Sequence, residues 1–220
     1  MTAGQVGCWQ LSPTGRTLPL EDRDYPEWHK GRVDYGVWLI TADLARVRER
    51  IAQVRAQLAP LLVPDAVPPR RQPHITVFVC GFIASAMVHG DDFTPAMLAA
   101  QRAALAAAAP SGFTLQIGGI DSFDSAVFLR VDDPQGGLAA LRRALGQGMR
   151  EIRQSAYVPH LTVGLYRAAF DTRMVADCLA AWQPQAPIAL RVECIELARY
   201  QARVLGGPLE TLEAHLLQNQ

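Results

Sequence analysis

Apolar residues along this 220-residue chain follow two spacings. Short runs rich in β-branched and aromatic residues predict strands, whereas apolar residues three and four positions apart predict one face of a helix. The predicted strands cover residues 35–40, 73–79, 113–117, 126–131, 158–166 and 188–197. The predicted helices cover residues 44–58, 95–109, 135–152 and 172–182, with a short helix over 208–217.

Polar residues mark where three of these helices begin. Thr94 followed by Pro95 is typical of an N-cap and a first-turn proline. Asp171 is expected to cap the helix that follows it, and Thr41 or Asp43 is expected to cap the first helix. Because strands and helices alternate along the chain, the order of elements indicates a layered α/β or α+β domain.

The order of elements looks duplicated, because each half contains a strand that begins with Pro-His. We therefore expect an α+β fold of two similar halves. Residues 1–34 have little periodicity and many turn formers, which predicts an N-terminal arm over a single domain of residues 35–220. Trp28 is expected to anchor this arm to the core.

Composition and charge exclude several classes of protein. Half of the residues are hydrophobic, which is too many for a disordered chain, yet no apolar run approaches the roughly 18 residues of a membrane span. The 21 basic and 21 acidic residues balance, so no broad basic surface for long nucleic acid is expected. The first residues lack a basic segment followed by an apolar core, so we expect no secretory signal and a cytoplasmic location.

The two Pro-His strands carry the most informative pattern. Residues 73–77 read Pro-His-Ile-Thr-Val, and residues 159–163 read Pro-His-Leu-Thr-Val. Because side chains alternate along a strand, each histidine shares a face with the threonine two residues later, and the aliphatic residues face the core. The candidate site residues are His74, Thr76, His160 and Thr162. The same alternation extends the two polar faces to Phe78, Gly164 and Tyr166.

A histidine two residues before a threonine is by itself ordinary strand composition. The shared proline, aliphatic residue and valine make a chance repeat much rarer, which favours a functional pair. A metal site is the alternative for two histidines, but it needs a third ligand, and no metal-binding spacing is present. We therefore expect no metal and no cofactor, and we interpret the remaining histidines as surface residues: His29, His89 and His215.

The paired His-x-Thr motifs in a duplicated frame resemble the two-histidine phosphoesterases, which include the bacterial 2′–5′ RNA ligases and the cyclic nucleotide phosphodiesterases. The resemblance covers roughly residues 33–200. It implies two similar lobes with antiparallel-rich sheets around a deep central cleft, and one motif from each lobe facing that cleft. The N-terminal arm departs from the shorter members of the family.

Histidine and threonine suit the hydrolysis of a 2′,3′-cyclic phosphate. A neutral imidazole can activate water as a base, while a protonated imidazole can donate to the departing ribose oxygen. The threonine hydroxyls can donate to the non-bridging phosphate oxygens. The resemblance implies hydrolysis of cyclic phosphates, and the internal symmetry leaves open which histidine is the acid. The expected partner is a nucleotide or RNA end with a cyclic phosphate, bound by a monomer without an obligate protein partner.

Two alternative functions stay open: a module that binds a nucleotide or RNA end without turnover, and a 2′–5′ RNA ligase. The neutral net charge argues against a large RNA partner. Further candidates for substrate binding are Tyr166, Arg130 and Trp38, whose structural interpretations are a rim aromatic, a solvated strand residue and a core tryptophan. Arg70 and Arg71 could guide an anion to the site.

Overall fold

The computed structural model describes residues 11–12, 15–19, 28–64, 71–152, 156–183, 185–204 and 206–219. In these ranges the strands form two sheets. The five-stranded sheet consists, in spatial order, of β3 (Asp92–Phe93), β2 (His74–Ile83), β1 (Asp34–Thr41), β8 (Cys194–Gln201) and β9 (Glu210–Leu216). The four-stranded sheet consists of β6 (His160–Leu165), β5 (Ala126–Asp132), β4 (Phe113–Ser122) and β7 (Ile188–Val192). Neighbouring strands are antiparallel, except that β2 and β3 are parallel.

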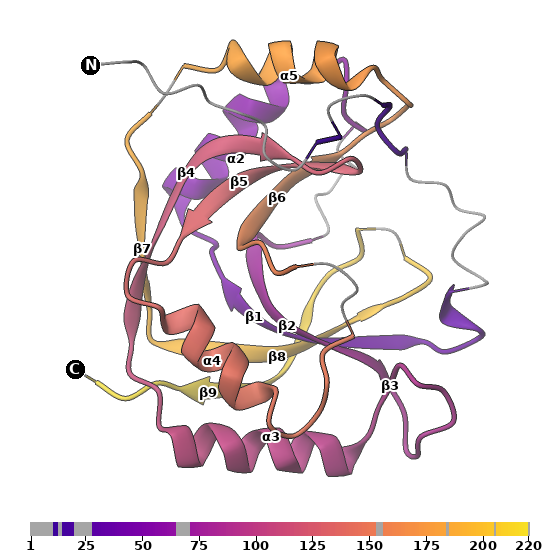
Figure 1. Cartoon of the computed structure of the whole chain (residues 1–220), viewed down its shortest axis with the longest axis vertical. Coiled ribbons are helices and arrows are strands. Elements are labelled where there is room, and N and C mark those ends of the chain that lie inside the picture. The colour runs from indigo at the N-terminus through magenta and orange to yellow at the C-terminus, as the bar shows by residue number, and fades with distance from the viewer. Residues whose placement is uncertain are drawn as a thin grey trace.

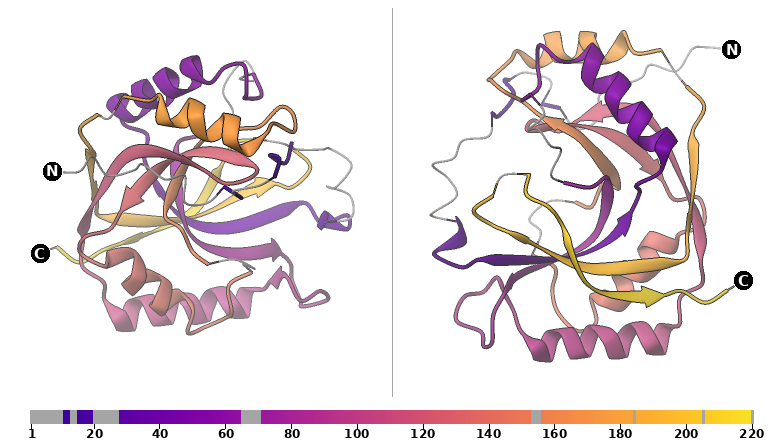
Figure 2. Two further views of the ribbon diagram at one scale, coloured as in Figure 1. Left: turned by 45° about the horizontal axis from the view of Figure 1, so that its top comes forward. Right: turned by 180° about the vertical axis from the view of Figure 1, so that it is seen from behind.

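In the described ranges, two pairs of helices lie outside the sheets (Figure 1). The helices α2 (Ala45–Gln57) and α5 (Thr172–Ala180) lie beside the four-stranded sheet. The helices α3 (Pro95–Ala108) and α4 (Gly137–Leu145) lie beside the five-stranded sheet. Figure 2 shows from another side that both sheets lie between the two helix pairs. The strand orders β2–β1–β8–β9 and β6–β5–β4–β7 correspond, so the duplicated α+β fold is confirmed.

Each of the two helices that precede a motif strand packs against the sheet to which that motif strand does not belong. We call α2 and α4 the exchanged helices. Helix α2 connects β1 to β2 of the five-stranded sheet, yet it packs against β6 of the other sheet. Helix α4 connects β5 to β6 of the four-stranded sheet, yet it packs against β2. Each sheet therefore has its outer face covered partly by a helix that the chain joins to the opposite sheet.

One continuous apolar cluster joins the helices to the helix-facing sides of both sheets. A second cluster lies on the other side of the five-stranded sheet and is formed by Tyr35, Val37, Leu39, Phe82, Ala198 and Ala202. The Trp28 ring packs 5.0 Å from the Tyr35 ring and 4.9 Å from the Phe82 ring, between centroids. Trp28 thus anchors its segment to this second cluster.

Further towards the N-terminus, the Thr17 amide donates to the carbonyl of Phe170, which holds the arm against the four-stranded half.

Local signals located some elements correctly. The Thr94 side chain accepts from the amide of Met97 at the start of α3. The Asp171 carboxylate accepts from the amides of Arg173 and Met174 at the start of α5. The caps predicted for α2 are wrong, because Leu44 is its N-cap residue and no side chain caps it.

Three segments differ from the predictions made for them. The predicted strand over 188–197 is two strands, because the chain passes from one sheet to the other at Glu193. The predicted helix over 208–217 is the strand β9, which pairs with β8 and is largely exposed, so its sequence carries little apolar alternation. Helix α4 ends at Leu145, because Gly146 takes the C-cap position. In the described part of the chain, no helix is long and apolar enough to cross a membrane.

Candidate active site

The two His-x-Thr motifs begin two strands that pack against each other from different sheets. His74 is the first residue of β2 and His160 is the first residue of β6. Both motifs show the predicted alternation, since each histidine is half-buried while the aliphatic residue and the valine are buried. The intervening threonines are more accessible: Thr76 is half-buried and Thr162 is exposed.

A β-bulge follows the threonine of the first motif. Thr76 pairs with Leu39 and Phe78 pairs with Trp38, which leaves Val77 as the extra residue. An extra residue shifts the alternation by one position, so the side chains beyond it change faces. Phe78 therefore packs in the core at 2% exposure, and its predicted position on the polar face is wrong.

The second motif has a bulge at the equivalent position. Thr162 pairs with Phe128 and Gly164 pairs with Val127, which leaves Val163 as the extra residue. The same shift of faces buries Tyr166 completely in the core. The Tyr166 hydroxyl and the Ser122 hydroxyl share a 2.5 Å hydrogen bond. The interpretation of Tyr166 as a substrate-binding or rim residue is thus wrong.

Both candidate histidines make the same hydrogen bond to the backbone two residues earlier. His74 Nδ1 lies 2.9 Å from the carbonyl oxygen of Gln72, and His160 Nδ1 lies 2.7 Å from that of Val158. A carbonyl oxygen only accepts, so Nδ1 carries the hydrogen in both rings. This fixes the tautomer of each neutral imidazole and leaves Nε2 as the atom that can accept or donate a proton.

Burial lowers the pKa of His74 to about 4, and the charges of Arg71 and His160 act in the same direction. The two motif rings are therefore close enough to influence each other's charge. Arg71 is held beside His74, because its guanidinium lies 4.2 Å over the ring of Tyr200 and its Nε donates to the carbonyl of Gly207.

His160 lies among aromatic rings. The Phe123 ring meets its imidazole edge-on at 4.9 Å, and the Phe128 ring lies 5.4 Å away, between centroids. The charge of Arg71 acts on His74, so the two equivalent histidines have different neighbouring side chains.

Arg130 lies directly opposite His160 in the antiparallel pair of β5 and β6, so the two side chains share one face. Gly119 makes room for the guanidinium, since a Cβ there would lie 2.7 Å from an Arg130 Nη atom. In the described part of the chain no hydrogen bond or ion pair engages Arg130 or the hydroxyls of the two motif threonines.

Two other predictions are wrong because the side chains are buried. Trp38 is fully buried, and its Nε1 donates a 2.9 Å hydrogen bond to Oε1 of the buried Gln101. It therefore cannot stack on a nucleotide base. His29 is not a surface residue, since it is 8% exposed and its Nδ1 accepts from the amide of Gly31. Arg70 lies outside the described residues.

Sequence reasoning missed three side chains that contact the backbone of the motifs. Arg142 donates to the carbonyl of Val77, Arg55 donates to the carbonyl of Val163, and Tyr157 donates to the carbonyl of Thr76. Every residue has a carbonyl group, so such contacts leave no mark on the residues that accept them. No sequence pattern could have identified these three residues.

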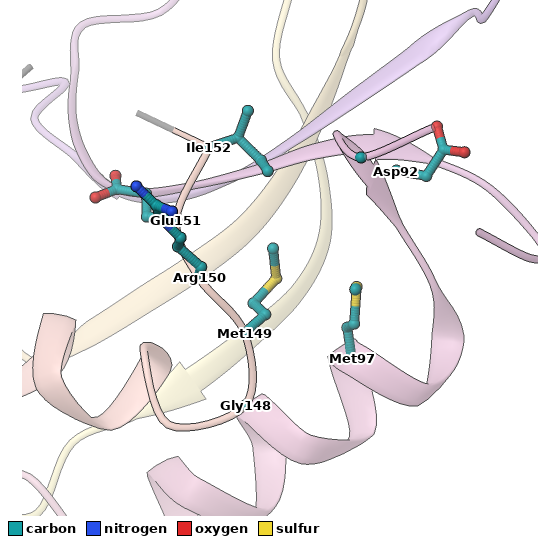
Figure 3. A pocket seen from close by; sticks show the side chains of 8 residues that line it. Asp92, Met97, Gly148, Met149, Arg150, Glu151 and Ile152 are labelled. Atoms are coloured by element: carbon teal, nitrogen blue, oxygen red, sulfur yellow. The ribbon is translucent and has the colours of Figure 1, made fainter. Parts of the chain in front are cut away.

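A pocket of about 400 Å³ lies between α3, β3 and the segment after α4. Figure 3 shows Met97 and Met149 between Asp92 at one end and Glu151 at the other. Both carboxylates are engaged within the protein, Asp92 with Arg32 and Glu151 with Arg142. No motif residue lines this pocket, so it is separate from the candidate site. Among the described residues, no group of three histidine, cysteine or acidic side chains is arranged to hold a metal.

Solved structures with this fold include E. coli LigT in its apo form, which matches with a TM-score of 0.57 and 20% identity over 85% of this chain and 99% of LigT. E. coli LigT complexed with 3′-AMP matches with a TM-score of 0.54 and 19% identity over 84% of this chain and 98% of that one. TT0787 of Thermus thermophilus matches with a TM-score of 0.51 and 14% identity over 84% and 99%. No curated protein matches the sequence.

The duplicated fold and the paired motif strands together define the class of two-histidine phosphoesterases. A family model, that of the 2′–5′ RNA ligase superfamily, matches residues 43–203. The chain therefore belongs to the 2′–5′ RNA ligase superfamily, as its two motifs predicted. Membership supports an activity of the phosphoesterase type.

Proposed function

We propose that this protein hydrolyses 2′,3′-cyclic phosphates of nucleotides or RNA ends, with His74 and His160 as the proton-transfer groups and Thr76 and Thr162 as phosphate ligands. One observation carries the proposal. The two motifs repeat the half-buried histidine, the buried aliphatic positions after it, the same bulge and the same Nδ1 hydrogen bond, although they belong to different sheets. Core packing alone does not require two imidazoles with the same fixed tautomer.

The proton chemistry follows from that tautomer. Water attacks phosphorus and loses a proton to Nε2 of a neutral imidazole, while the bond to one ribose oxygen breaks and that oxygen takes a proton from the other imidazole. His74 is neutral at pH 7, since its pKa is about 4, so it is available as the base and His160 serves as the acid. A bound phosphate anion favours the charged form of the His74 imidazole, which raises its pKa and strengthens it as the base.

Positive charge and hydroxyl groups near the histidines suit a phosphate. The Thr76 and Thr162 hydroxyls can donate to the two non-bridging oxygens as negative charge develops. Arg130, opposite His160, can add a bidentate contact to the phosphate, and the charge of Arg71 favours an anion near His74. These groups neutralise a phosphate without a metal or cofactor.

A nucleotide is the proposed substrate class. E. coli LigT has been solved with 3′-AMP and with ATP, which supports nucleotide binding by a chain of the same fold. We expect the protein to act in the cytoplasm as a monomer. Joining of RNA ends through a 2′–5′ linkage uses the same groups in the reverse direction, and the family to which the chain belongs favours it as the second candidate.

The test is hydrolysis of the four nucleoside 2′,3′-cyclic phosphates in excess EDTA by the wild type, His74→Ala and His160→Ala. We expect turnover that survives EDTA and is lost in both variants, with one product isomer. Undiminished turnover in either variant, or turnover that EDTA abolishes, contradicts the proposed mechanism. Tight nucleotide binding without any product indicates a binding module. When RNA fragments with cyclic-phosphate ends replace the nucleotides, joined ends without hydrolysis indicate a ligase.

A further inference from the structure

Each motif strand is held by an arginine from an exchanged helix. Arg142, in the last turn of α4, donates a 2.6 Å hydrogen bond to the carbonyl of Val77 in β2. Arg55, in the last turn of α2, donates a 2.7 Å hydrogen bond to the carbonyl of Val163 in β6. The two contacts are equivalent, because each joins the end of an exchanged helix to the bulge of one motif.

The chain continues from each of these helices into the other motif. Helix α2 leads towards His74, but its arginine binds the strand that carries His160. Helix α4 leads towards His160, but its arginine binds the strand that carries His74. Both hydrogen bonds therefore restrict how the two motif strands can move relative to one another.

A set of contacts around Arg142 connects the first motif to the second histidine. Arg142 pairs with Glu151 at 2.5 Å, and its guanidinium carbon lies 3.8 Å from the centre of the Tyr157 ring. The Tyr157 hydroxyl donates to the carbonyl of Thr76 at 2.9 Å. The next residue, Val158, provides the carbonyl that accepts from His160 Nδ1. Tyr157, which contacts the backbone of the first motif, is thus adjacent to Val158, which orients the His160 ring of the second motif.

The contact of Arg55 depends on a glycine in the second motif strand. A Cβ at Gly164 would lie 2.7 Å from Arg55 Nη1, so a larger residue there would displace the guanidinium. The second Nη atom of Arg55 donates to the carbonyl of Val63 at 2.9 Å, on the segment that follows α2. Arg55 therefore ties the second motif to the chain that leads towards the first.

We propose that Arg55 and Arg142 are positioning residues, which set the separation and orientation of the two His-x-Thr motifs by holding their bulges from the exchanged helices. Each bulge is one residue beyond a motif threonine and three residues beyond a motif histidine. A displaced bulge moves the histidine and the threonine of one motif relative to those of the other motif. Small misplacements of reacting groups cost large factors in rate. The proposal rests on the proposed function for its kinetic consequences.

The kinetic test compares Arg142→Met, Arg55→Met and Tyr157→Phe with the wild type on a nucleoside 2′,3′-cyclic phosphate, well below every melting temperature. We expect kcat to fall about 10- to 100-fold with KM within a few-fold of the wild type, because the reacting groups are misplaced while the binding groups stay. Arg142→Lys should recover part of kcat. Arg102→Met, which removes only an exposed ion pair with Glu213, is the control and should keep the wild-type kcat.

A second measurement does not need turnover. NMR titration of the His74 ring reports its surroundings, and one of the nearby charges is that of His160. Burial of the ring and the charge of His160 both lower the His74 pKa, so a displaced motif strand changes the midpoint. We expect the His74 midpoint to shift in Arg142→Met and in Arg55→Met, and to stay at the wild-type value in Arg102→Met. Unchanged midpoints together with an unchanged kcat overturn the positioning role. A shifted midpoint in a protein whose wild type has no turnover leaves the positioning role standing and refutes the proposed function.

Discussion

Val77 and Val163 hold equivalent positions, each as the extra residue of a β-bulge immediately after a motif threonine. Up to the bulge, the histidine and the threonine share one face of the strand, and beyond it Phe78 and Tyr166 lie in the core instead of on that face. The bulges therefore end the polar face of each motif strand at its threonine. The two-residue spacing before each bulge gives Thr76 and Thr162 the same place relative to their histidines.

Replacing the threonines by valine tests their contribution to the reaction. Valine keeps the branched shape but removes the hydroxyl, so the developing charge on phosphate loses a donor. We expect kcat/KM to fall about 100-fold or more in Thr76→Val and in Thr162→Val. Thr211→Val, on the exposed strand β9, is the control and should retain wild-type kinetics. Equal kinetics in all three variants would exclude the threonines as phosphate ligands.

Replacing Arg130 tests whether it binds the phosphate. Arg130→Met keeps most of the side-chain volume and removes the charge that shares a face with His160. Loss of a charged hydrogen bond of about 1.5–3 kcal/mol raises KM about 10- to 100-fold. Arg48→Met, which breaks an exposed ion pair with Asp43, should leave KM unchanged. If the two variants have the same KM, Arg130 is a solvated strand residue.

Trp38→Phe separates a core tryptophan from a base-stacking one. The substitution removes the indole N–H, so the buried Oε1 of Gln101 loses the hydrogen bond that Trp38 donates. We expect a loss of about 1–3 kcal/mol in the free energy of unfolding, measured by urea denaturation, and an unchanged KM. A KM raised tenfold with full stability would restore the stacking interpretation.

The pKa of His74 predicts how stability depends on pH. Because the folded pKa is about 4 and the ordinary value is 6.5, the unfolded chain binds more protons between these two pH values. The stability associated with neutral His74 is full above about pH 6.5 and is lost as the pH falls through about 4. The loss is on the order of 3 kcal/mol. Urea denaturation at about pH 7 and about pH 4.5 should show a smaller loss for His74→Asn than for the wild type, and equal losses would contradict the shifted pKa.

Short-range patterns were sufficient for the motifs and for some helix ends. The alternation of side chains put His74 with Thr76, and His160 with Thr162, because neighbouring positions face opposite sides of a strand wherever no bulge intervenes. Thr94 and Asp171 were correctly predicted as caps, since an N-cap satisfies amides within three residues of itself. Strand alternation and helix caps depend only on residues within a few positions of each other along the chain.

Other features depended on which segments pair in space. Tyr166 was misplaced because the bulge at Val163 arises from the pairing of β6 with β5, and β9 was misassigned because an exposed edge strand needs little apolar alternation. By itself the sequence determined the class of fold, the two motifs and their residue chemistry. Only the tertiary structure decided the burial that lowers the pKa of His74 and the contacts of Arg55 and Arg142, because both depend on atoms brought close from distant parts of the chain.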